Sequence, residues 1–170
     1  LREKMNQQLY YPIEAMPDGR KSFIQIILDE IAKGKLNAYD GNTITADTLL
    51  TPTTYADIEA KMGAGEAKIK KIDINTQQEI DTTIMQEARP ADVKQLLLYE
   101  EWYFDKKLSK LDVRIIGICP IFVGMDVATG RQKKDRLFWI RYDEARDVLS
   151  QKEVYNPFND AQRISFDDYF

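Results

Sequence analysis

The sequence contains no histidine and one cysteine, Cys119, among its 170 residues. Without histidine, the chain lacks the commonest general base, the usual metal ligand and the side chain that titrates near neutral pH. A single cysteine excludes an internal disulfide and any zinc site built on paired cysteines. Cys119 lies in an apolar run before Pro120, with no base to activate it, so we predict a buried structural thiol.

Long apolar runs and an excess of positive charge are also missing. No apolar run approaches the ~20 residues that span a bilayer. The net charge of −4 argues against a dedicated nucleic-acid binder, which is normally basic. The chain begins at Leu1 without an initiator methionine and ends at Phe170 without a polar tail, so we expect a fragment of a longer protein. A signal peptide would have been removed from such a fragment, so its absence says nothing about location.

The length and the helical patterns indicate one α+β domain over residues 1–170. A chain of this size can bury about 70% of its unfolded surface. Apolar residues at helical spacing follow a capping Ser22 and end before Gly34. A second helix is expected over 54–62 and a third over 142–150.

The strand signal begins at Val93. Alternation over residues 96–104 places Leu96, Leu98, Trp102 and Phe104 on one face of a strand, and Tyr99 and Tyr103 on the other. A helix over 92–104 is the alternative, although the aromatic content favours a strand. Further strands over 114–123 and 137–140 complete an antiparallel β-meander, roughly 96–140, with helices packed against it. Pro120 suggests an edge position or a bulge in the second of these strands.

Residues 42–54 are typical of a loop, and the segment 63–92 is polar and irregular by pattern. Ile69, Ile72 and Ile74 suggest one strand within it, which Ile80 and Ile84 continue weakly. We interpret 42–92 as a polar, mobile insertion in the domain.

The acidic residues give little sign of a catalytic or metal site. Neighbours on a strand point to opposite faces, so Glu100 and Glu101 cannot both enter one cleft. The stretch 40–47 resembles a calcium loop but lacks the closing glutamate, because Thr51 occupies the twelfth position. We therefore predict no catalytic residues, no metal and no cofactor.

The sequence favours a protein that works by contact. Aromatic and charged side chains that lie close together are typical of protein interfaces. Three groups are candidate partner-binding residues: Trp102, Tyr103 and Asp105 in a hairpin, Arg131, Lys133 and Lys134 in a basic turn, and Phe158, Phe166 and Tyr169 in the tail.

Five segments together resemble the GldN/PorN family of gliding-motility and type IX secretion components. They are LREKMNQQLYYPI (1–13), LNAYD (36–40), EEWYFDKKLSKLDVRIIGICP (100–120), LFWIRYDEAR (137–146) and YNPFNDAQRISFDDYF (155–170). The resemblance implies a periplasmic, non-enzymatic protein at the periplasmic face of the outer membrane. It also implies a PorK/GldK-type lipoprotein partner, a ring of many copies, and contact with the periplasmic region of a PorM/GldM-type motor protein. It implies no catalytic residues.

Two other functions remain open from the residues alone. In a glycan-binding module for the cell wall, Trp102 or Trp139 would stack on sugar, and Lys133 and Lys134 would meet carboxylates. In a glycosidase, Glu101 and Asp105 would supply the acid and the base.

Overall fold

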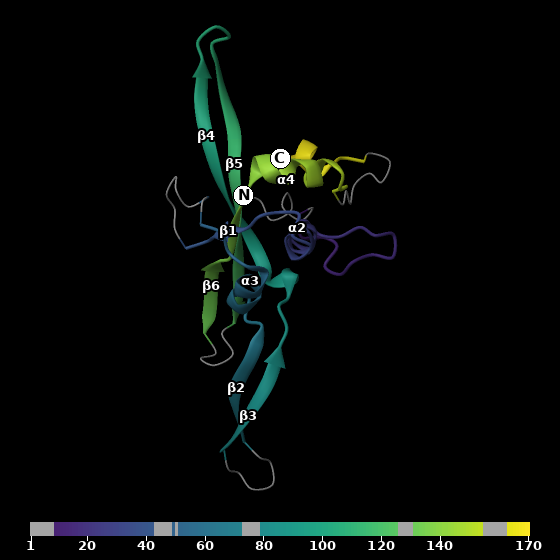
Figure 1. Ribbon diagram of the computed structural model, residues 1–170, viewed down its shortest axis with the longest axis vertical. Coiled ribbons are helices and arrows are strands. Elements are labelled where there is room, and N and C mark those ends of the chain that lie inside the picture. The colour runs from purple at the N-terminus through teal and green to yellow at the C-terminus, as the bar shows by residue number, and fades with distance from the viewer. Residues whose placement is uncertain (1–8, 43–48, 50, 73–78, 126–130, 155–162) are drawn as a thin grey trace.

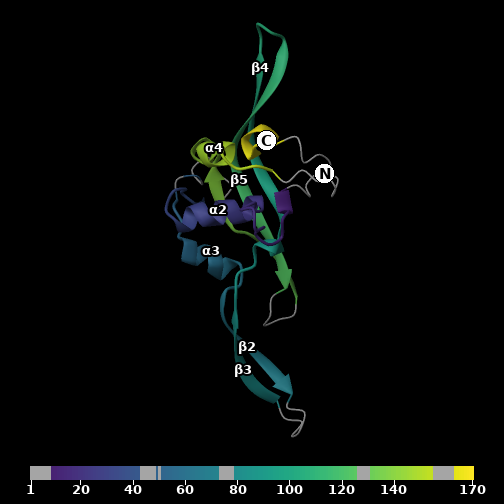
Figure 2. The same cartoon turned by 90° about the vertical axis from the view of Figure 1, so that its right-hand side faces the viewer.

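The structure is a computed structural model that describes residues 9–42, 49, 51–72, 79–125, 131–154 and 163–170. The molecule is elongated, with a central body of helices packed on a sheet (Figure 1). One β-hairpin projects from each end of this body, and the view turned by 90° shows the same arrangement (Figure 2).

The helices form where the capping signals predicted them. Helix α2 spans Phe23–Ala32 and begins with a capping box, in which Ser22 and Gln25 each accept a hydrogen bond from the other's backbone N–H. Helix α3 (Tyr55–Lys61) begins with the same arrangement of Thr54 and Asp57. Helix α4 spans Tyr142–Ser150, and the short helix α5 spans Phe166–Tyr169. Within the described residues, no helix has the length and apolar character that crossing a membrane requires.

The main sheet is antiparallel and confirms the predicted meander. Its strands are β1 (Tyr39–Asp40), β4 (Val93–Asp105), β5 (Lys110–Met125), β6 (Gln132–Arg136) and β7 (Phe138–Arg141). They follow the order β1-β7-β5-β4, and β6 pairs with β5 alone. The alternative helix over 92–104 is wrong, because a single 3-10 turn at Pro90–Asp92 leads directly into β4.

Pro120 lies in the central strand β5 rather than on an edge strand. On one side, β5 pairs with β7 at Gly117 and Ile118, and with β6 from Ile121 onward. Pro120 falls between these two ladders, where its carbonyl accepts a hydrogen bond from Leu137. The missing N–H of proline therefore coincides with an interruption in the ladder, where no pairing donor is needed.

The two faces of the sheet bury different clusters. The main core lies between the sheet and the helices, where Phe23, Ile27, Ile118, Phe138 and Phe166 are fully buried. A smaller cluster on the opposite face contains Leu49, Cys119 and Trp139. Helices thus cover one face of the sheet, as the sequence predicted.

The segment 65–86 is more regular than its sequence suggests. Strands β2 (Gly65–Ile72) and β3 (Glu79–Gln86) pair in register from Gly65–Gln86 to Ile72–Glu79 and form the second projecting hairpin. The expectation of an irregular segment with one strand was wrong here. Backbone pairing between two strands formed a regular hairpin although the apolar alternation is weak. The mobility of 42–92 stays a prediction.

Candidate interaction surface

Strands β4 and β5 continue beyond the helices as a two-stranded hairpin (Figure 1). Its turn is closed by Asp105, whose Oδ1 accepts hydrogen bonds from the backbone N–H groups of Lys107 (2.7 Å) and Leu108 (3.2 Å). Ser109 completes the turn with a φ of 48°, in the left-handed region that non-glycine residues rarely adopt. This local geometry fixes the end of the hairpin.

One face of the hairpin carries an exposed apolar strip, which we define as Leu98, Trp102, Phe104, Leu111 and Val113. The register places Trp102 opposite Val113 and Phe104 opposite Leu111. The side chains of Trp102, Phe104 and Leu111 are 62%, 58% and 57% exposed. Residues two apart on a strand share a face, so the strip continues the sheet face on which Leu96 and Ile115 pack against the main core.

The other face of the hairpin is polar. The pairs across it are Glu101 with Arg114, Tyr103 with Asp112, and Asp105 with Lys110. Nearer the body, the Tyr99 ring meets the Trp139 ring edge-on, with 6.5 Å between centroids. The hairpin is therefore amphipathic, and the predicted division of its aromatic residues between two faces is confirmed.

Exposed apolar side chains are concentrated on this hairpin. Twelve large hydrophobic side chains are exposed among the described residues, and eight of them belong to the part of β4 and β5 that forms the hairpin, or to its turn, while Met125 lies at the far end of β5. The eight are Leu98, Tyr99, Trp102, Tyr103, Phe104, Leu108, Leu111 and Val113. Contiguous exposed apolar surface of this kind marks interaction sites in soluble proteins.

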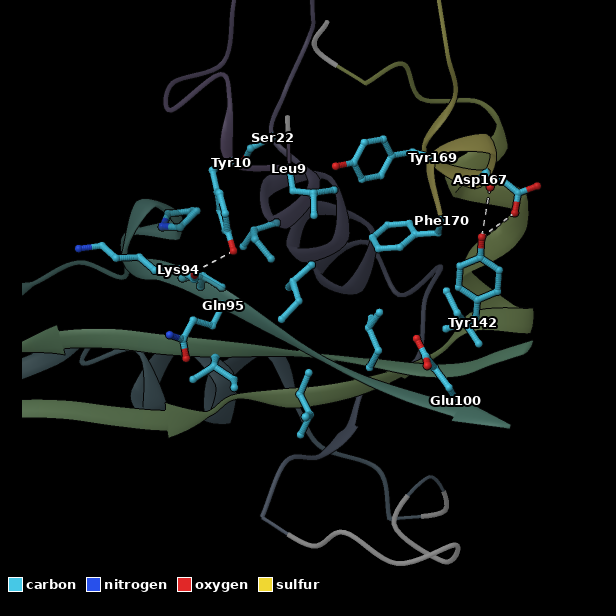
Figure 3. A pocket seen from close by; sticks show the side chains of 18 of the residues that line it. Leu9, Tyr10, Ser22, Lys94, Gln95, Glu100, Tyr142, Asp167, Tyr169 and Phe170 are labelled. Atoms are coloured by element: carbon cyan, nitrogen blue, oxygen red, sulfur yellow. Dashed lines mark hydrogen bonds between the residues drawn. The ribbon is translucent and has the colours of Figure 1, made fainter. Parts of the chain in front are cut away.

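An open groove of about 2010 Å³ lies at the base of the hairpin, between the sheet and both ends of the described chain (Figure 3). Tyr10 forms part of one wall, and its hydroxyl donates to the Lys94 carbonyl at 2.7 Å. On the opposite side, Tyr142 donates to Asp167 Oδ1 at 2.9 Å. Burial, followed by this bond to a carboxylate, raises the pKa of Tyr142 to about 12. Burial likewise raises the pKa of Tyr10.

Two arginines that line the groove are compensated within the chain. Arg141 pairs with Asp143 at 2.8 Å, and Arg146 pairs with Asp167 at 3.1 Å. Glu100 is different. Its half-buried side chain accepts a hydrogen bond from Trp102 Nε1 at 3.1 Å, and no cationic side chain pairs with it within the described part of the chain. An uncompensated carboxylate therefore lies where the groove meets the apolar strip.

The predicted hairpin residues lie together at this surface, with different roles. Trp102 is exposed on the apolar strip, and Tyr103 is exposed on the polar face. Asp105 is occupied in closing the turn. Its partner-binding role stays a prediction, since its carboxylate already accepts two backbone hydrogen bonds.

The basic residues lie at the other end of β5. Arg131 is exposed just before β6, and Lys133 and Lys134 lie within that strand. The basic turn expected for these three residues is therefore wrong at Lys133 and Lys134. Lys133 Nζ pairs with Asp135 at 2.7 Å. Pairing with β5 draws these residues into a strand, which overrides the turn composition.

The tail residues do not form one surface. Phe158 lies outside the described residues. Phe166 is fully buried, and its ring centroid lies 5.6 Å from that of Phe23. Tyr169 is half-buried and lines the groove beside Phe170 (Figure 3). Only Tyr169 of the described tail candidates is therefore placed where a partner segment could reach it.

Sequence reasoning missed Glu100, Leu98, Leu111 and Val113 as members of the surface. The signal for the β5 residues was present, because Leu111, Val113 and Ile115 alternate with charged or polar neighbours. The alternation alone does not show which face of the sheet these side chains occupy. The pairing of β5 with β4 shows that they share a face with Trp102.

The described residues include no group of three or more acidic or cysteine side chains placed to hold a metal ion. Asp40, from the calcium-like stretch, instead pairs with Lys61 at 2.9 Å, and this contact lowers the pKa of Asp40. Cys119 is fully buried, and burial raises the pKa of its thiol to about 12. The prediction of a buried structural thiol is confirmed.

A comparison with protein families tests the resemblance to the GldN/PorN family that five sequence segments suggested. The family model described as gliding motility associated protein GldN matches residues 1–170. The chain belongs to the GldN family. A search of curated proteins found no match. Membership of GldN makes the chain a gliding-motility-associated protein, and the match includes the polar segment that the sequence resemblance left out.

Proposed function

We propose that this GldN-family chain is a non-enzymatic structural and adaptor subunit of the periplasmic ring of the type IX secretion system. It binds a PorK/GldK-type lipoprotein at the periplasmic face of the outer membrane. Many copies of the pair form the ring, which contacts the periplasmic region of a PorM/GldM-type motor protein. The family match over the whole chain supports the proposal.

The amphipathic β4–β5 hairpin is the observation that carries the adaptor role. It places most of the exposed large apolar side chains of the described residues on one projecting element. A two-stranded hairpin alone is marginally stable in water, and its apolar face gains stability when another surface covers it. A binding element that projects from a helix-covered body suits a subunit that joins two other proteins.

A binding measurement with purified proteins tests this role. The full chain is mixed with the GldK-type lipoprotein lacking its lipid, and the affinity is measured by calorimetry. We expect a complex that Trp102→Ala weakens by about 30-fold or more, because buried aromatic anchors dominate interface energies. Met125→Ala is the matched control, since Met125 is equally exposed at the far end of β5. Absence of a complex with the wild-type chain would overturn the lipoprotein assignment.

Cell fractionation tests the location. We expect the chain in the membrane fraction of gliding cells, released by salt or urea without detergent and degraded by protease only after the outer membrane is permeabilised. Recovery in the cytosol would contradict the periplasmic assignment.

A glycan-binding module is the second candidate, and the exposed ring of Trp102 favours it. The structure separates the other residues of that hypothesis. The Trp139 ring is only 3% exposed and cannot stack on a sugar. Trp102 pairs with Val113, and Lys134 pairs with Val123, so they lie about 33 Å apart along β5. Co-sedimentation of the chain with purified peptidoglycan at low salt would identify this function.

For an enzyme, the arrangement of the acids is unfavourable. Asp105 closes the hairpin turn, and Glu101 lies opposite Arg114 on an open, exposed face. We infer that neither acts as a catalytic group. A Glu101→Gln, Asp105→Asn double variant is expected to support secretion, and loss of secretion with an intact complex would contradict this.

A further inference from the structure

We propose that the apolar strip binds one amphipathic α-helix of the lipoprotein partner, and that a lysine or arginine on that helix pairs with Glu100. This inference rests on the proposed function and specifies the chemistry of the contact. It assigns a docking site to the side of the hairpin that faces the same way as the helices of the body.

The first argument is the continuity of layers. Helices α2, α4 and α5 pack on one face of the sheet, and the hairpin extends that face beyond them (Figure 2). Two residues of the strip, Leu98 and Val113, also line the groove, so the strip and the groove form one continuous surface. A helix laid on the strip would extend the helical layer of the body by one member, and its apolar side chains would meet Trp102, Phe104 and Leu111.

The second argument is charge complementarity. Glu100 lies between apolar neighbours on the docking face, and its hydrogen bond comes from the neutral indole of Trp102. Covering a carboxylate without a counter-charge is costly, so a partner that buries Glu100 has to supply a cation. Arg141 and Arg146 are already paired with Asp143 and Asp167. Arg114 lies opposite Glu101 in the strand register, on the other face of the hairpin. The cation therefore comes from the occupant.

The third argument distinguishes a foreign helix from a second copy of this chain. The apolar residues of the described helices are used in the core, including Phe23 and Ile27 of α2, Leu149 of α4 and Phe166 of α5. None of these helices offers a free apolar face to a neighbouring copy. Packing two strips face to face would cover two Glu100 carboxylates with a surface that supplies no cation, which is costly.

Neighbouring glutamates provide a matched test. Glu100 and Glu101 are adjacent on β4 and point to opposite faces. We expect Glu100→Lys to weaken binding of the lipid-free lipoprotein by at least 10-fold, and Glu101→Lys to change it by less than 2-fold. Reversing the charge of the partner's cation is expected to restore binding to Glu100→Lys. Equal effects of the two variants, or no effect of either, would overturn the inference.

Site-specific cross-linking identifies the occupant. The photoreactive residue p-benzoyl-phenylalanine replaces Trp102 in one variant and Tyr103 in the other, in the full chain mixed with the lipoprotein. We expect residue 102 to cross-link to a helical segment of the lipoprotein that carries a lysine or arginine, and residue 103 to cross-link less. Cross-links from residue 102 to a second copy, to a partner strand or loop, or to lipid in added vesicles would each overturn the inference.

The two proposals fail in different ways. If the wild-type chain does not bind the lipoprotein, the proposed adaptor function fails. If the wild-type chain binds but Trp102→Ala and Glu100→Lys bind equally well, the adaptor function stands and the docking of a helix on the strip is wrong. Circular dichroism of each variant checks that the fold is intact.

Discussion

The rings of Phe23 and Phe166 lie 5.6 Å apart with 50° between their planes, so the first residue of α2 packs directly on the first residue of α5. Phe170 adds a second contact, with its ring centroid 5.3 Å from that of Phe23. Both phenylalanines of the pair are fully buried. The last helix of the chain is therefore part of the core that forms around α2.

Phe166→Ala should destabilise the fold strongly. Removing a fully buried phenylalanine eliminates its burial free energy and leaves a cavity, which together cost about 3–5 kcal/mol. Trp102→Ala is the control, because Trp102 is largely exposed and its removal should change stability by about 0.5 kcal/mol or less. Urea unfolding followed by circular dichroism measures both, and equal stabilities for the two variants would contradict the burial of Phe166.

Gly41→Ala should also destabilise the fold, through a backbone contact. A Cβ atom at Gly41 would lie 2.7 Å from the Arg136 carbonyl oxygen and 2.9 Å from the Leu137 carbonyl carbon. Because these are backbone atoms between β6 and β7, the sheet itself would have to shift, at about 1–3 kcal/mol. Thermal unfolding should show a lower Tm than the wild type. An unchanged Tm would mean that the loop before β7 does not approach Gly41 closely.

Cys119 should be unreactive in the folded protein. Its thiol is fully buried, and its raised pKa of about 12 leaves almost no thiolate at neutral pH. An aromatic disulfide reagent should label no thiol under native conditions and one thiol per chain in denaturant. Rapid labelling without denaturant would show that the cluster around Trp139 is open to solvent.

Tyr142 should make stability sensitive to alkaline pH. Its folded pKa of about 12 is raised above the ordinary value of 10.0, so its contribution is complete below pH 10 and is lost as the pH rises toward 12. The stability difference between the wild type and Tyr142→Phe should therefore shrink between pH 10 and pH 12. Urea unfolding at three pH values measures this difference. A constant difference would mean that Tyr142 titrates equally in both states.

The helices and the meander could be predicted because local signals and the final packing agree. Ser22 and Thr54 cap helices where capping residues precede apolar periodicity, and alternation from Leu96 to Phe104 matches a strand with one core-facing side. The hairpin over 65–86 was not predicted, because its stability as an element depends on pairing between strands rather than on a strong local pattern.

The interaction surface was predictable only in part. The aromatic run around Trp102 identified the hairpin, but the sequence could not show which side chains remain uncovered once the helices have packed. Phe166 illustrates the limit, because an aromatic residue near the end of the chain is equally suited to a surface and to a core. Glu100 matters because no cationic side chain pairs with it among the described residues. The sequence could not show this, because it depends on which side chains the fold brings near Glu100.

Within the described residues, β4 is the last strand of the main sheet and pairs with β5 alone. Its second edge and the strip beside it also bear on how cells make this protein. Chains produced in excess of their binding partner would expose this apolar strip and the backbone groups of the strand edge. Such a surface promotes aggregation and makes the chain a substrate for quality-control proteases. We therefore expect balanced synthesis of the two proteins to matter as much for the survival of this chain as the strength of its own core.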